Sequence, residues 1–413
     1  MNKTFENAQT KAEVRAISSK SEAHRALICA ALSDAPCFVE CNDTNNDIDA
    51  TARCLCALGA KIERRENGFF VDPISKVSQN AKLDAGESGS TLRFLIPLAA
   101  ALGANCRFLM RGRLPHRPLS PMYELLAENG VTLSPQGSNP LIVGGELCGG
   151  NYAIAANVSS QYVSGLLFAL SVSKGKSTLK LTESIESAPY ILMTLDTLLA
   201  FGADIAFHKK TSTFTINGKE RLCSPSHFKV GGDWSNAAFF LCAGAIGNRA
   251  VTVCGLDESS RQGDRAILDV LKRMGARITR DKGRITVYPS KLCGIEVDAS
   301  DIPDLVPIIC TAASVASGTT TVFNASRLRL KESDRIRSVC SFLSALGADI
   351  TPTEDGMTVR GRSYLSGGTA DSANDHRIAM SAAVASLACK GSVTVSGFEA
   401  INKSYPSFLE NFQ

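Results

Sequence analysis

LGAKI, at residues 58–62, is the first of five similar segments that recur along this chain of 413 residues. Each segment follows an apolar pattern of helical spacing and precedes a run in which apolar and polar residues alternate. The glycine suits a helix C-cap, because glycine adopts the left-handed conformation needed there at little cost. The glycines are spaced 71 to 73 residues apart, at Gly59, Gly130, Gly202, Gly275 and Gly347.

A second repeated feature is a helix rich in small residues that opens with Ser, Asp or Asn. Most copies are followed by a turn containing glycine and a short β-branched segment. Each repeat is therefore predicted as helix, strand, helix, glycine, strand and strand, which indicates an α/β fold. The six copies of this helix are predicted to start near Ser21, Ser88, Ser159, Ser235, Asp301 and Asn374.

The N-terminal segment is predicted to complete the last repeat. Five glycine segments serve six helices, because a sixth glycine would fall beyond Gln413. We expect the missing strands to come from residues 1–17, where Val14, Ala16 and Ile17 have an extended pattern.

Three repeats per domain then predict a first domain of residues 18–228. The second domain would combine residues 1–17 with residues 229–413. The chain would cross between the domains twice, near Ser18–Ser19 and near Val230–Gly232, where two glycines favour a hinge.

Composition narrows the class of protein. Hydrophobic residues make up 44% of the chain and charged residues 20%, as in a globular protein with a large core. A net charge of +4 is too small for a general nucleic-acid binder. The 14 cysteines form no Cys-x-x-Cys pair, which favours a reducing compartment. With no signal-peptide core and no run near 18 apolar residues, we expect a cytoplasmic protein and no membrane partner.

Residues 327–335, RLRLKESDR, combine a predicted strand end with a predicted helix start. Leu328 and Leu330 alternate with charged residues as in a strand, and Ser333 or Asp334 can cap the following helix. Two cations and two carboxylates meet at this point, where an anion can be held and a proton moved. Taken alone, such a cluster is more often a solvated charged turn, since most runs of charged residues lie on the surface.

The starts of the other predicted helices also carry groups that bind anions. If the three helices of a domain pack side by side, their unpaired N–H groups and partial positive charges converge. Arginines there would grip carboxylates or phosphates bidentately, so a cleft for small, multiply charged anions is predicted. The cations concerned are Lys20, Arg25, Arg93, Arg117, Lys331, Arg335, Arg377 and Lys403.

Simpler interpretations stay open for single residues. Ser21, Ser88 and Ser159 are also ordinary helix caps, and Lys20 and Arg25 also suit a solvated helix face. The five histidines show no metal-ligand spacing, so we predict no metal, no cofactor and a structural role for His376.

Together these stretches resemble the EPSP synthase family (3-phosphoshikimate 1-carboxyvinyltransferases) over essentially the whole chain. The most specific match is KESDR at 331–335 followed by NDHR at 374–377, whereas SSQ at 159–161 is weak alone. The resemblance implies an inside-out α/β barrel of the enolpyruvyl transferase type. Two domains would each hold three βαβαββ units, with the active site in the cleft between them. Further matches are Ser19–Ser21 with Arg25, Ser88–Arg93, Arg117–Pro118, Pro189–Tyr190, Gly232–Asp233, Gln262–Asp264, Ile302–Asp304 and Lys403.

The resemblance also implies a reaction of the shikimate pathway, which supplies chorismate for aromatic amino-acid biosynthesis. The enolpyruvyl group of phosphoenolpyruvate would pass to the 5-hydroxyl of shikimate 3-phosphate, releasing phosphate. The family's reaction adds the hydroxyl to form a tetrahedral intermediate and then eliminates phosphate.

Site residues are carried over by match to the family's motifs. Asp304 would be the base on the attacking hydroxyl, Glu332 would protonate the methylene carbon, and Lys20 or Lys403 would assist the leaving phosphate. Residues expected to bind shikimate 3-phosphate are Lys20, Ser21, Arg25, Ser159, Ser160, Gln161, Ser187, Asp304 and Lys331. Residues expected to bind phosphoenolpyruvate are Lys20, Gly89, Arg117, Gln161, Arg335, Arg377 and Lys403.

The chain departs from the family pattern at a few positions. Glu87 replaces a common asparagine and would repel the phosphate of phosphoenolpyruvate unless it turns away or pairs with an arginine. Ile17-Ser18, Ala188 and Arg327 also differ from the usual residues. Gly89 leaves room where the herbicide glyphosate binds in the family, so we predict inhibition by glyphosate.

Two alternative functions are weighed against this one. A UDP-N-acetylglucosamine enolpyruvyl transferase would carry a reactive cysteine in the loop at 113–118, where this chain has none. A non-catalytic anion-binding repeat protein would leave Asp304 and Glu332 idle, and 6% aromatic residues offer few stacking platforms for a nucleic acid. We expect a monomer whose domains close on shikimate 3-phosphate, because a dianion would bridge cations from both.

Overall fold

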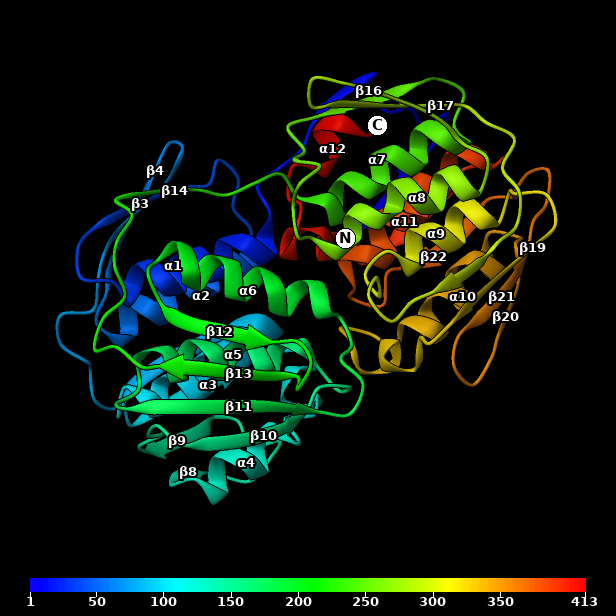
Figure 1. The fold of residues 1–413 in the computed structure, drawn as a ribbon. Coiled ribbons are helices and arrows are strands. Elements are labelled where there is room, and N and C mark those ends of the chain that lie inside the picture. Colours follow the sequence, from blue (N-terminus) through cyan, green and yellow to red (C-terminus); the bar gives the residue numbers. More distant parts are fainter. The chain divides into compact units, whose positions relative to one another are not determined.

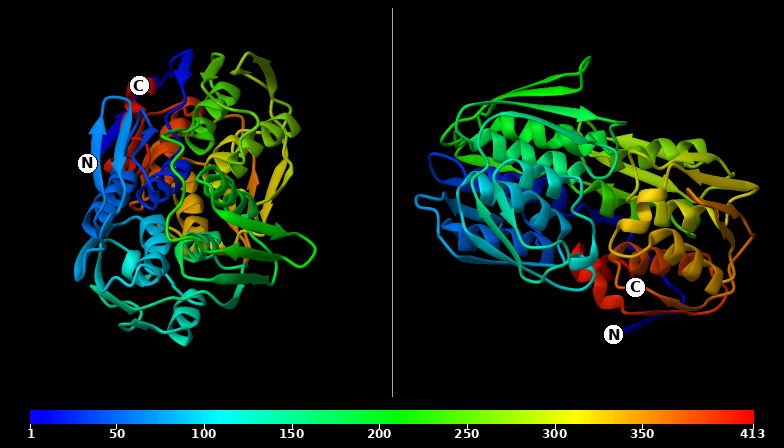
Figure 2. Two further views of the ribbon diagram at one scale, coloured as in Figure 1. Left: turned by 60° about the vertical axis from the view of Figure 1, so that its left-hand side comes forward. Right: turned by 90° about the horizontal axis from the view of Figure 1, so that it is seen from below.

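The computed structural model describes residues Met1 to Gln413, and the chain divides into two compact units. The continuous unit is Ser18–Val230, and the split unit combines Met1–Ile17 with Gly231–Gln413. Both termini lie in the split unit and near each other, where Gln9 N donates to Gln413 O at 2.6 Å (Figure 2).

The same four-stranded sheet recurs in both units. Two neighbouring strands run parallel, and two antiparallel strands continue the sheet, as in the order β6-β7-β9-β8 of the second repeat. The third and fifth repeats have the equivalent orders β10-β11-β13-β12 and β18-β19-β21-β20. The strands of the second and third repeats are β6 (Ala81–Gly86), β7 (Cys106–Met110), β8 (Val131–Leu133), β9 (Leu141–Gly145), β10 (Asn151–Ala155), β11 (Lys176–Thr182), β12 (Asp204–His208) and β13 (Thr213–Asn217). Those of the fifth are β18 (Glu296–Asp298), β19 (Thr319–Phe323), β20 (Asp349–Pro352) and β21 (Met357–Arg360).

The first and fourth sheets take their outer parallel strand from a distant part of the sequence. In the first, β3 (Cys37–Glu40) pairs in parallel with β14 (His227–Lys229), which ends the continuous unit. In the fourth, β15 (Val251–Cys254) pairs in parallel with β2 (Glu13–Arg15). The remaining strands are β4 (Lys61–Arg65) and β5 (Gly68–Asp72) of the first sheet, and β16 (Arg277–Asp281) and β17 (Arg284–Tyr288) of the fourth.

The prediction that Val14 completes the last repeat is therefore wrong. Val14 lies in β2, opposite Val253 of the fourth sheet. The last repeat is completed by an earlier part of the N-terminal segment, β1 (Asn2–Phe5), which runs antiparallel to β23 (Val393–Ser396) beside β22 (Gly368–Asp371). Hydrophobic alternation marks Val14 as extended but does not say which sheet edge it joins.

Helices fill the interior of each unit and strands lie at its periphery (Figures 1 and 2). In α7, every residue from Trp234 to Ala245 is buried. Small residues let these helices approach closely: a Cβ added to Gly165 of α5 would lie 2.3 Å from Arg93 O of α3. The helices of the continuous unit are α1 (Lys20–Ala31), α2 (Asn46–Leu58), α3 (Gly89–Ala101), α4 (Met122–Glu128), α5 (Ser160–Val172) and α6 (Ala188–Ala200). Those of the split unit are α7 (Trp234–Ile246), α8 (Ile267–Arg273), α9 (Val306–Ala313), α10 (Arg335–Ala345), α11 (His376–Ala385) and α12 (Phe408–Asn411).

All five repeat glycines follow a helix and have positive φ, between 68° and 122°. At Gly59, the C-cap of α2, a Cβ would also lie only 2.3 Å from Lys76 O. The predicted C-cap role is therefore confirmed, and both the backbone conformation and the packing exclude a side chain at Gly59.

Two local predictions need correction. Ser326–Leu330 forms a 3-10 helix, η3, instead of a strand end, because the Asp355 carboxylate accepts the N–H groups of Asn324, Ala325 and Ser326 and turns the chain there. The helix expected near Asp301 begins at Val306, so Asp304 lies in the preceding turn.

Candidate active site

Arg335 is the centre of a charged cluster in the split unit. It is the first residue of α10, which is capped by Asp334, and its side chain is 1% exposed. Its guanidinium contacts three carboxylates, from Asp304 at 2.7 Å, Glu332 at 2.7 Å and Asp375 at 2.8 Å. We call these residues, together with Lys331 and Arg377, the Arg335 cluster. Three acids balance three bases, which is the condition for burying so many charges.

Asp304 joins the cations of this cluster. Its Oδ1 lies 2.7 Å from Arg335 Nη1 and 3.8 Å from Lys331 Nζ, and its Oδ2 accepts from Arg377 Nη2 at 2.9 Å. Burial alone would raise the pKa of Asp304, but Arg377, Lys331 and Arg335 outweigh it and hold this pKa far below its usual range. Asp304 is therefore a firmly ionised carboxylate and a weak base in this state.

For Lys331, burial outweighs the neighbouring charges in setting the pKa. Its burial lowers its pKa to about 8, and Asp304 opposes that shift only in part. Lys331 can therefore exchange a proton near neutral pH more readily than an exposed lysine.

Asp375 and Lys403 organise the start of α11. Asp375 is the N-cap, is fully buried and accepts from Arg377 N at 3.0 Å and Ser333 Oγ at 3.2 Å. Lys403, at the end of the 3-10 helix η5 (Phe398–Lys403), donates to Asn374 O at 2.7 Å. These contacts place Lys403 beside the turn that leads into the Arg335 cluster.

Asp264 is a second buried acid near this cluster. It lies in the 3-10 helix η2 (Gly263–Ala266), and Ser235 Oγ at the start of α7 donates to its Oδ2. Burial and the nearby Asp304 charge raise the pKa of Asp264 to about 6, although Arg377 works in the other direction.

In the continuous unit, Gly89 lies between two guanidinium groups. A Cβ at Gly89 would lie 2.8 Å from Arg117 Nη1 and 2.9 Å from Arg93 Nη1. Gly89 is the first residue of α3, whose N-cap Ser88 accepts from Thr91 N at 3.2 Å. Helix N–H groups and two arginines at one point suit a phosphate.

Gln161 links this point to α5. Its Oε1 accepts from Arg93 Nη1 at 2.8 Å, and its Nε2 donates to Ser90 Oγ at 2.9 Å. Ser159 is the N-cap of α5, and Ser160 is the first residue of the helix and is buried. The predicted SSQ segment therefore lies at a helix start, where Gln161 contacts Arg93, one of the two arginines that flank Gly89.

Arg25 occupies another part of the continuous unit. Its guanidinium donates to Tyr190 O at 2.9 Å, to Ser21 O at 2.5 Å and to Thr194 Oγ1 at 2.8 Å. Ser187, the N-cap of α6, is buried with a left-handed φ of 53°. Lys20, the first residue of α1, donates to Asp47 Oδ2 at 3.0 Å.

The Glu87 side chain is directed to the neighbouring loop. A Cβ added to Gly112 would lie 2.5 Å from Glu87 Oε2, so the carboxylate packs against that glycine.

The predicted residues thus form separate groups within their own units. Asp304, Lys331, Glu332, Arg335 and Arg377 are in mutual contact, and Gly89, Arg117 and Gln161 share contacts with Arg93. Lys20, Ser21, Arg25, Ser159, Ser160 and Ser187 lie at or near the starts of α1, α5 and α6.

Two residues of these groups had no role assigned from sequence: Asp264 and Asp375. The available signal for Asp375 was its place before His376 and Arg377 at a helix start, where an acid can both cap the helix and pair with a neighbouring arginine.

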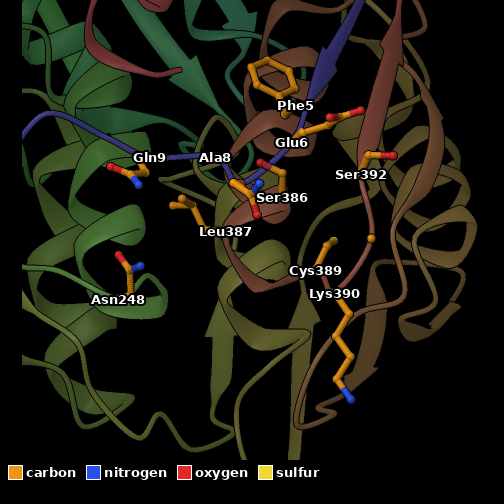
Figure 3. Close-up of a pocket in the computed structure, with 12 residues that line it drawn as sticks. Phe5, Glu6, Ala8, Gln9, Asn248, Ser386, Leu387, Cys389, Lys390 and Ser392 are labelled. Atoms are coloured by element: carbon orange, nitrogen blue, oxygen red, sulfur yellow. The ribbon is translucent and has the colours of Figure 1, made fainter.

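A separate cavity of about 610 Å³ lies in the split unit (Figure 3). It is lined by residues 5–9, by Asn248 and by residues of the segment 386–392. None of the predicted site residues lines it, so the motifs give it no role. No helix in the structure is long and apolar enough to cross a membrane.

The repeated sheets around buried helices define the fold class of the enolpyruvyl transferases. An EPSP synthase structure from Acinetobacter baumannii superposes with a TM-score of 0.81 at 26% identity, covering 100% of this chain and 98% of that one. The enolpyruvyl transferase NikO from Streptomyces tendae shares the fold, with a TM-score of 0.79 at 21% identity over 98% of this chain and 94% of that one.

Sequence comparison gives the family. The family model described as EPSP synthase (3-phosphoshikimate 1-carboxyvinyltransferase) matches residues 6–412. Proteins named 3-phosphoshikimate 1-carboxyvinyltransferase from Clostridium novyi and Clostridium acetobutylicum are 40% and 41% identical to this chain. They align over 97% and 98% of this chain and 94% of their own length. The chain belongs to the EPSP synthase family.

Proposed function

We propose that this protein transfers the enolpyruvyl group of phosphoenolpyruvate to the 5-hydroxyl of shikimate 3-phosphate, as an enzyme of aromatic amino-acid biosynthesis. The observation that carries the proposal is the Arg335 cluster. Two buried arginines, Arg335 and Arg377, already hold a carboxylate, that of Asp304, within a set of acids and bases suited to proton transfer.

In this proposal both units contribute residues to the substrate contacts. Shikimate 3-phosphate would be held by the starts of α1, α5 and α6, with its phosphate on Ser159, Ser160 and Ser187 and its carboxylate on Ser21 and Arg25. Asp304 and Lys331 would contact its hydroxyls, and Lys20 and Gln161 would lie near both substrates.

Phosphoenolpyruvate would bind at two points. Its phosphate would lie on Gly89, Arg117, Lys20 and Lys403, because helix N–H groups and fixed cations favour a dianion. Its carboxylate would lie on Arg335 and Arg377 and would compete there with Asp304.

This competition supplies a role for Asp304. While three cations surround it, its pKa is too low for an effective base. A substrate carboxylate on Arg335 and Arg377 would take over part of that positive charge and raise the proton affinity of Asp304. Binding of phosphoenolpyruvate would thus make Asp304 a stronger base for the 5-hydroxyl of shikimate 3-phosphate.

The chemistry balances as addition followed by elimination. Asp304 accepts the proton of the 5-hydroxyl while the oxygen adds to C2 of phosphoenolpyruvate and Glu332 gives a proton to C3. In the second step the Glu332 carboxylate takes a proton back from the methyl group while the bond from C2 to the phosphate oxygen breaks. Phosphate leaves with the proton that Asp304 had accepted, assisted by Lys20 or Lys403. The enolpyruvyl ether and inorganic phosphate are the products.

Phosphate release with defined acceptors tests the function. Purified protein with phosphoenolpyruvate should release phosphate with shikimate 3-phosphate and none with UDP-N-acetylglucosamine. Release with the nucleotide sugar alone, or with neither acceptor, would refute the proposal. We also propose a cytoplasmic monomer that glyphosate inhibits, and the absence of inhibition at millimolar glyphosate would contradict the latter.

A further inference from the structure

Five helices of the continuous unit form a closed ring of packed neighbours. In order around the ring, α1 packs on α2, α2 on α3, α3 on α5, α5 on α6, and α6 on α1. Polar side chains bridge every one of these steps, near the ends of the helices that carry the predicted substrate contacts. Such bridges within an apolar core are unusual, because each buried hydroxyl must find a partner.

The first arc of this ring runs from α1 through α2 to α3. His24 Nδ1 lies 2.7 Å from Thr51 Oγ1, and Thr51 Oγ1 lies 2.6 Å from Thr91 Oγ1. Thr91 Oγ1 in turn donates to Ser88 Oγ at 2.7 Å. Every side chain of this arc is at most 1% exposed, and it ends on the cap beside Gly89.

The direction of these hydrogen bonds follows from donor counting. With Thr91 donating to Ser88, Thr51 must donate to Thr91, and His24 Nδ1–H must donate to Thr51. Burial, aided by Lys20 and Arg25, holds the pKa of His24 well below its ordinary value, so the ring is neutral and its single proton lies on Nδ1. The hydrogen bonds therefore all run in one direction, from His24 through Thr51 and Thr91 to Ser88 at the start of α3.

The second arc runs from α1 through α6 to α5. Arg25 Nε donates to Thr194 Oγ1 at 2.8 Å, and Thr194 Oγ1 lies 2.7 Å from Ser164 Oγ. Thr194 and Ser164 are fully buried. This arc ends on Arg25, which is assigned to the carboxylate of shikimate 3-phosphate, and does not contact Gly89.

We propose that the two arcs are positioning devices with separate tasks, an inference that rests on the proposed function. Thr51 and Thr91 fix the start of α3 and hence the phosphate of phosphoenolpyruvate, whereas Thr194 and Ser164 fix Arg25 and hence shikimate 3-phosphate. None of these four residues is assigned a contact with either substrate. Thr51 and Thr91 affect catalysis only by positioning Ser88. Thr194 and Ser164 affect it only by positioning Arg25.

Paired substitutions separate the two tasks. Thr91→Val keeps the shape of the side chain and removes its hydroxyl, and it should raise the KM for phosphoenolpyruvate about tenfold, the equivalent of one hydrogen bond. Thr194→Val should raise the KM for shikimate 3-phosphate by about the same factor. Each variant should leave the other KM within about twofold, since the arcs end on different substrates.

Controls distinguish positioning from packing. Thr91→Ser and Thr194→Ser keep the hydroxyl and lose a methyl group, so both should restore the wild-type KM. Thr197→Val is the matched control, because Thr197 is buried in α6 but bonds only to Met193 O of its own helix, at 2.9 Å. It should leave both KM values unchanged.

The wild-type assay is run first and tests the proposed function by itself. In an active wild type, equal rises of both KM values in each Val variant, or Ser variants worse than Val variants, would overturn the inference. So would a Thr197→Val variant that behaves like the other two. If Thr91→Val does not unfold cooperatively, Thr51→Val, one bond further from Ser88, takes its place with the same expected result.

Discussion

We propose that Asp304 changes role when a substrate carboxylate binds to its arginine partners. Its carboxylate is shared by Arg335, Arg377 and Lys331. A carboxylate bound so firmly stabilises the cluster but cannot take a proton readily, because its pKa is held low. We therefore propose that Asp304 acts as a base only when a second anion binds Arg335 and Arg377.

Asp304→Asn should lower kcat by about 10²–10⁴, the range expected on losing a general base. It should also lower Tm, since Arg377 and Lys331 lose their shared carboxylate. Steady-state kinetics and thermal unfolding measure both effects. Asp298→Asn is the control, because Asp298 bonds to Asn324 and Ser300 outside the cluster. Equal kcat values for the two variants would exclude Asp304 as the base.

Asp264 predicts a pH dependence of stability. Its folded pKa of about 6 lies above its ordinary value of 3.8, so between these values the folded chain binds a proton that the unfolded chain has lost. Its contribution is therefore present below pH 4 and is lost as the pH rises to about 6. The groups that face it are Asp304, Arg377, Ser235 and Asp233.

The comparison with Asp264→Asn isolates this contribution. From pH 4 to pH 6, wild type should lose on the order of 2–3 kcal/mol relative to the variant, and the difference should be constant above that range. Urea unfolding at a series of pH values measures it. A difference that is flat, or that changes in the opposite direction, would contradict the prediction.

Among the elements, α3 combines three local features at its start. Ser88 caps it, and Gly89 leaves space for two guanidinium groups. One comes from Arg93 of α3 and the other from Arg117, in the segment after β7. The Ser88 cap can be predicted from the sequence because it depends on residues within one turn. The convergence of Arg93 and Arg117 on Gly89 depends on tertiary packing.

Gly89→Ala should displace these guanidinium groups, because the added Cβ would lie within 2.9 Å of both. We expect the KM for phosphoenolpyruvate to rise about tenfold and Tm to change little, since flexible side chains can move aside. Gly150→Ala is the matched control, because a Cβ there meets only Tyr152 atoms, at an ordinary 3.6 Å. An unchanged KM in Gly89→Ala would place the phosphate elsewhere.

At the scale of the whole molecule, the chain passes twice from one unit to the other, and a strand next to each crossing completes a sheet. The strand before α1 stays in the split unit, and β14 takes the place beside β3 in the continuous unit. Each unit therefore has complete sheets of its own, and the continuous unit does so from one uninterrupted segment.

Residues 18–230 should thus fold without the rest of the chain. We expect cooperative unfolding by circular dichroism and no enolpyruvyl transfer. A fragment of residues 18–225 lacks β14, leaves β3 as an open edge, and should be less stable. Equal stability of the two fragments, or an unfolded longer fragment, would count against the independence of this unit.

Closure of the two units on shikimate 3-phosphate is the remaining prediction at this scale. The Arg335 cluster pairs three acids with three bases, so we expect closure to be driven by bridging by the substrate and not by relief of repulsion between bare cations. The radius of gyration from solution scattering should fall with shikimate 3-phosphate and stay constant with inorganic phosphate. Equal values with and without shikimate 3-phosphate would exclude closure.

The sequence by itself determined the features that depend on neighbouring residues. The glycines after α2, α4, α6, α8 and α10 and the caps Ser88 and Ser159 could be predicted, because a backbone conformation or a helix end is decided within one turn. The motifs also identified the family, because KESDR and NDHR occur in a specific order.

Only the tertiary structure decided which distant groups meet. Val14 pairs in the fourth sheet, residues 326–330 turn as a 3-10 helix around Asp355, and Asp375 and Asp304 share Arg335. Strand edges and buried charges find partners through packing over long separations, and an alternating pattern or a charged residue is compatible with several such partners.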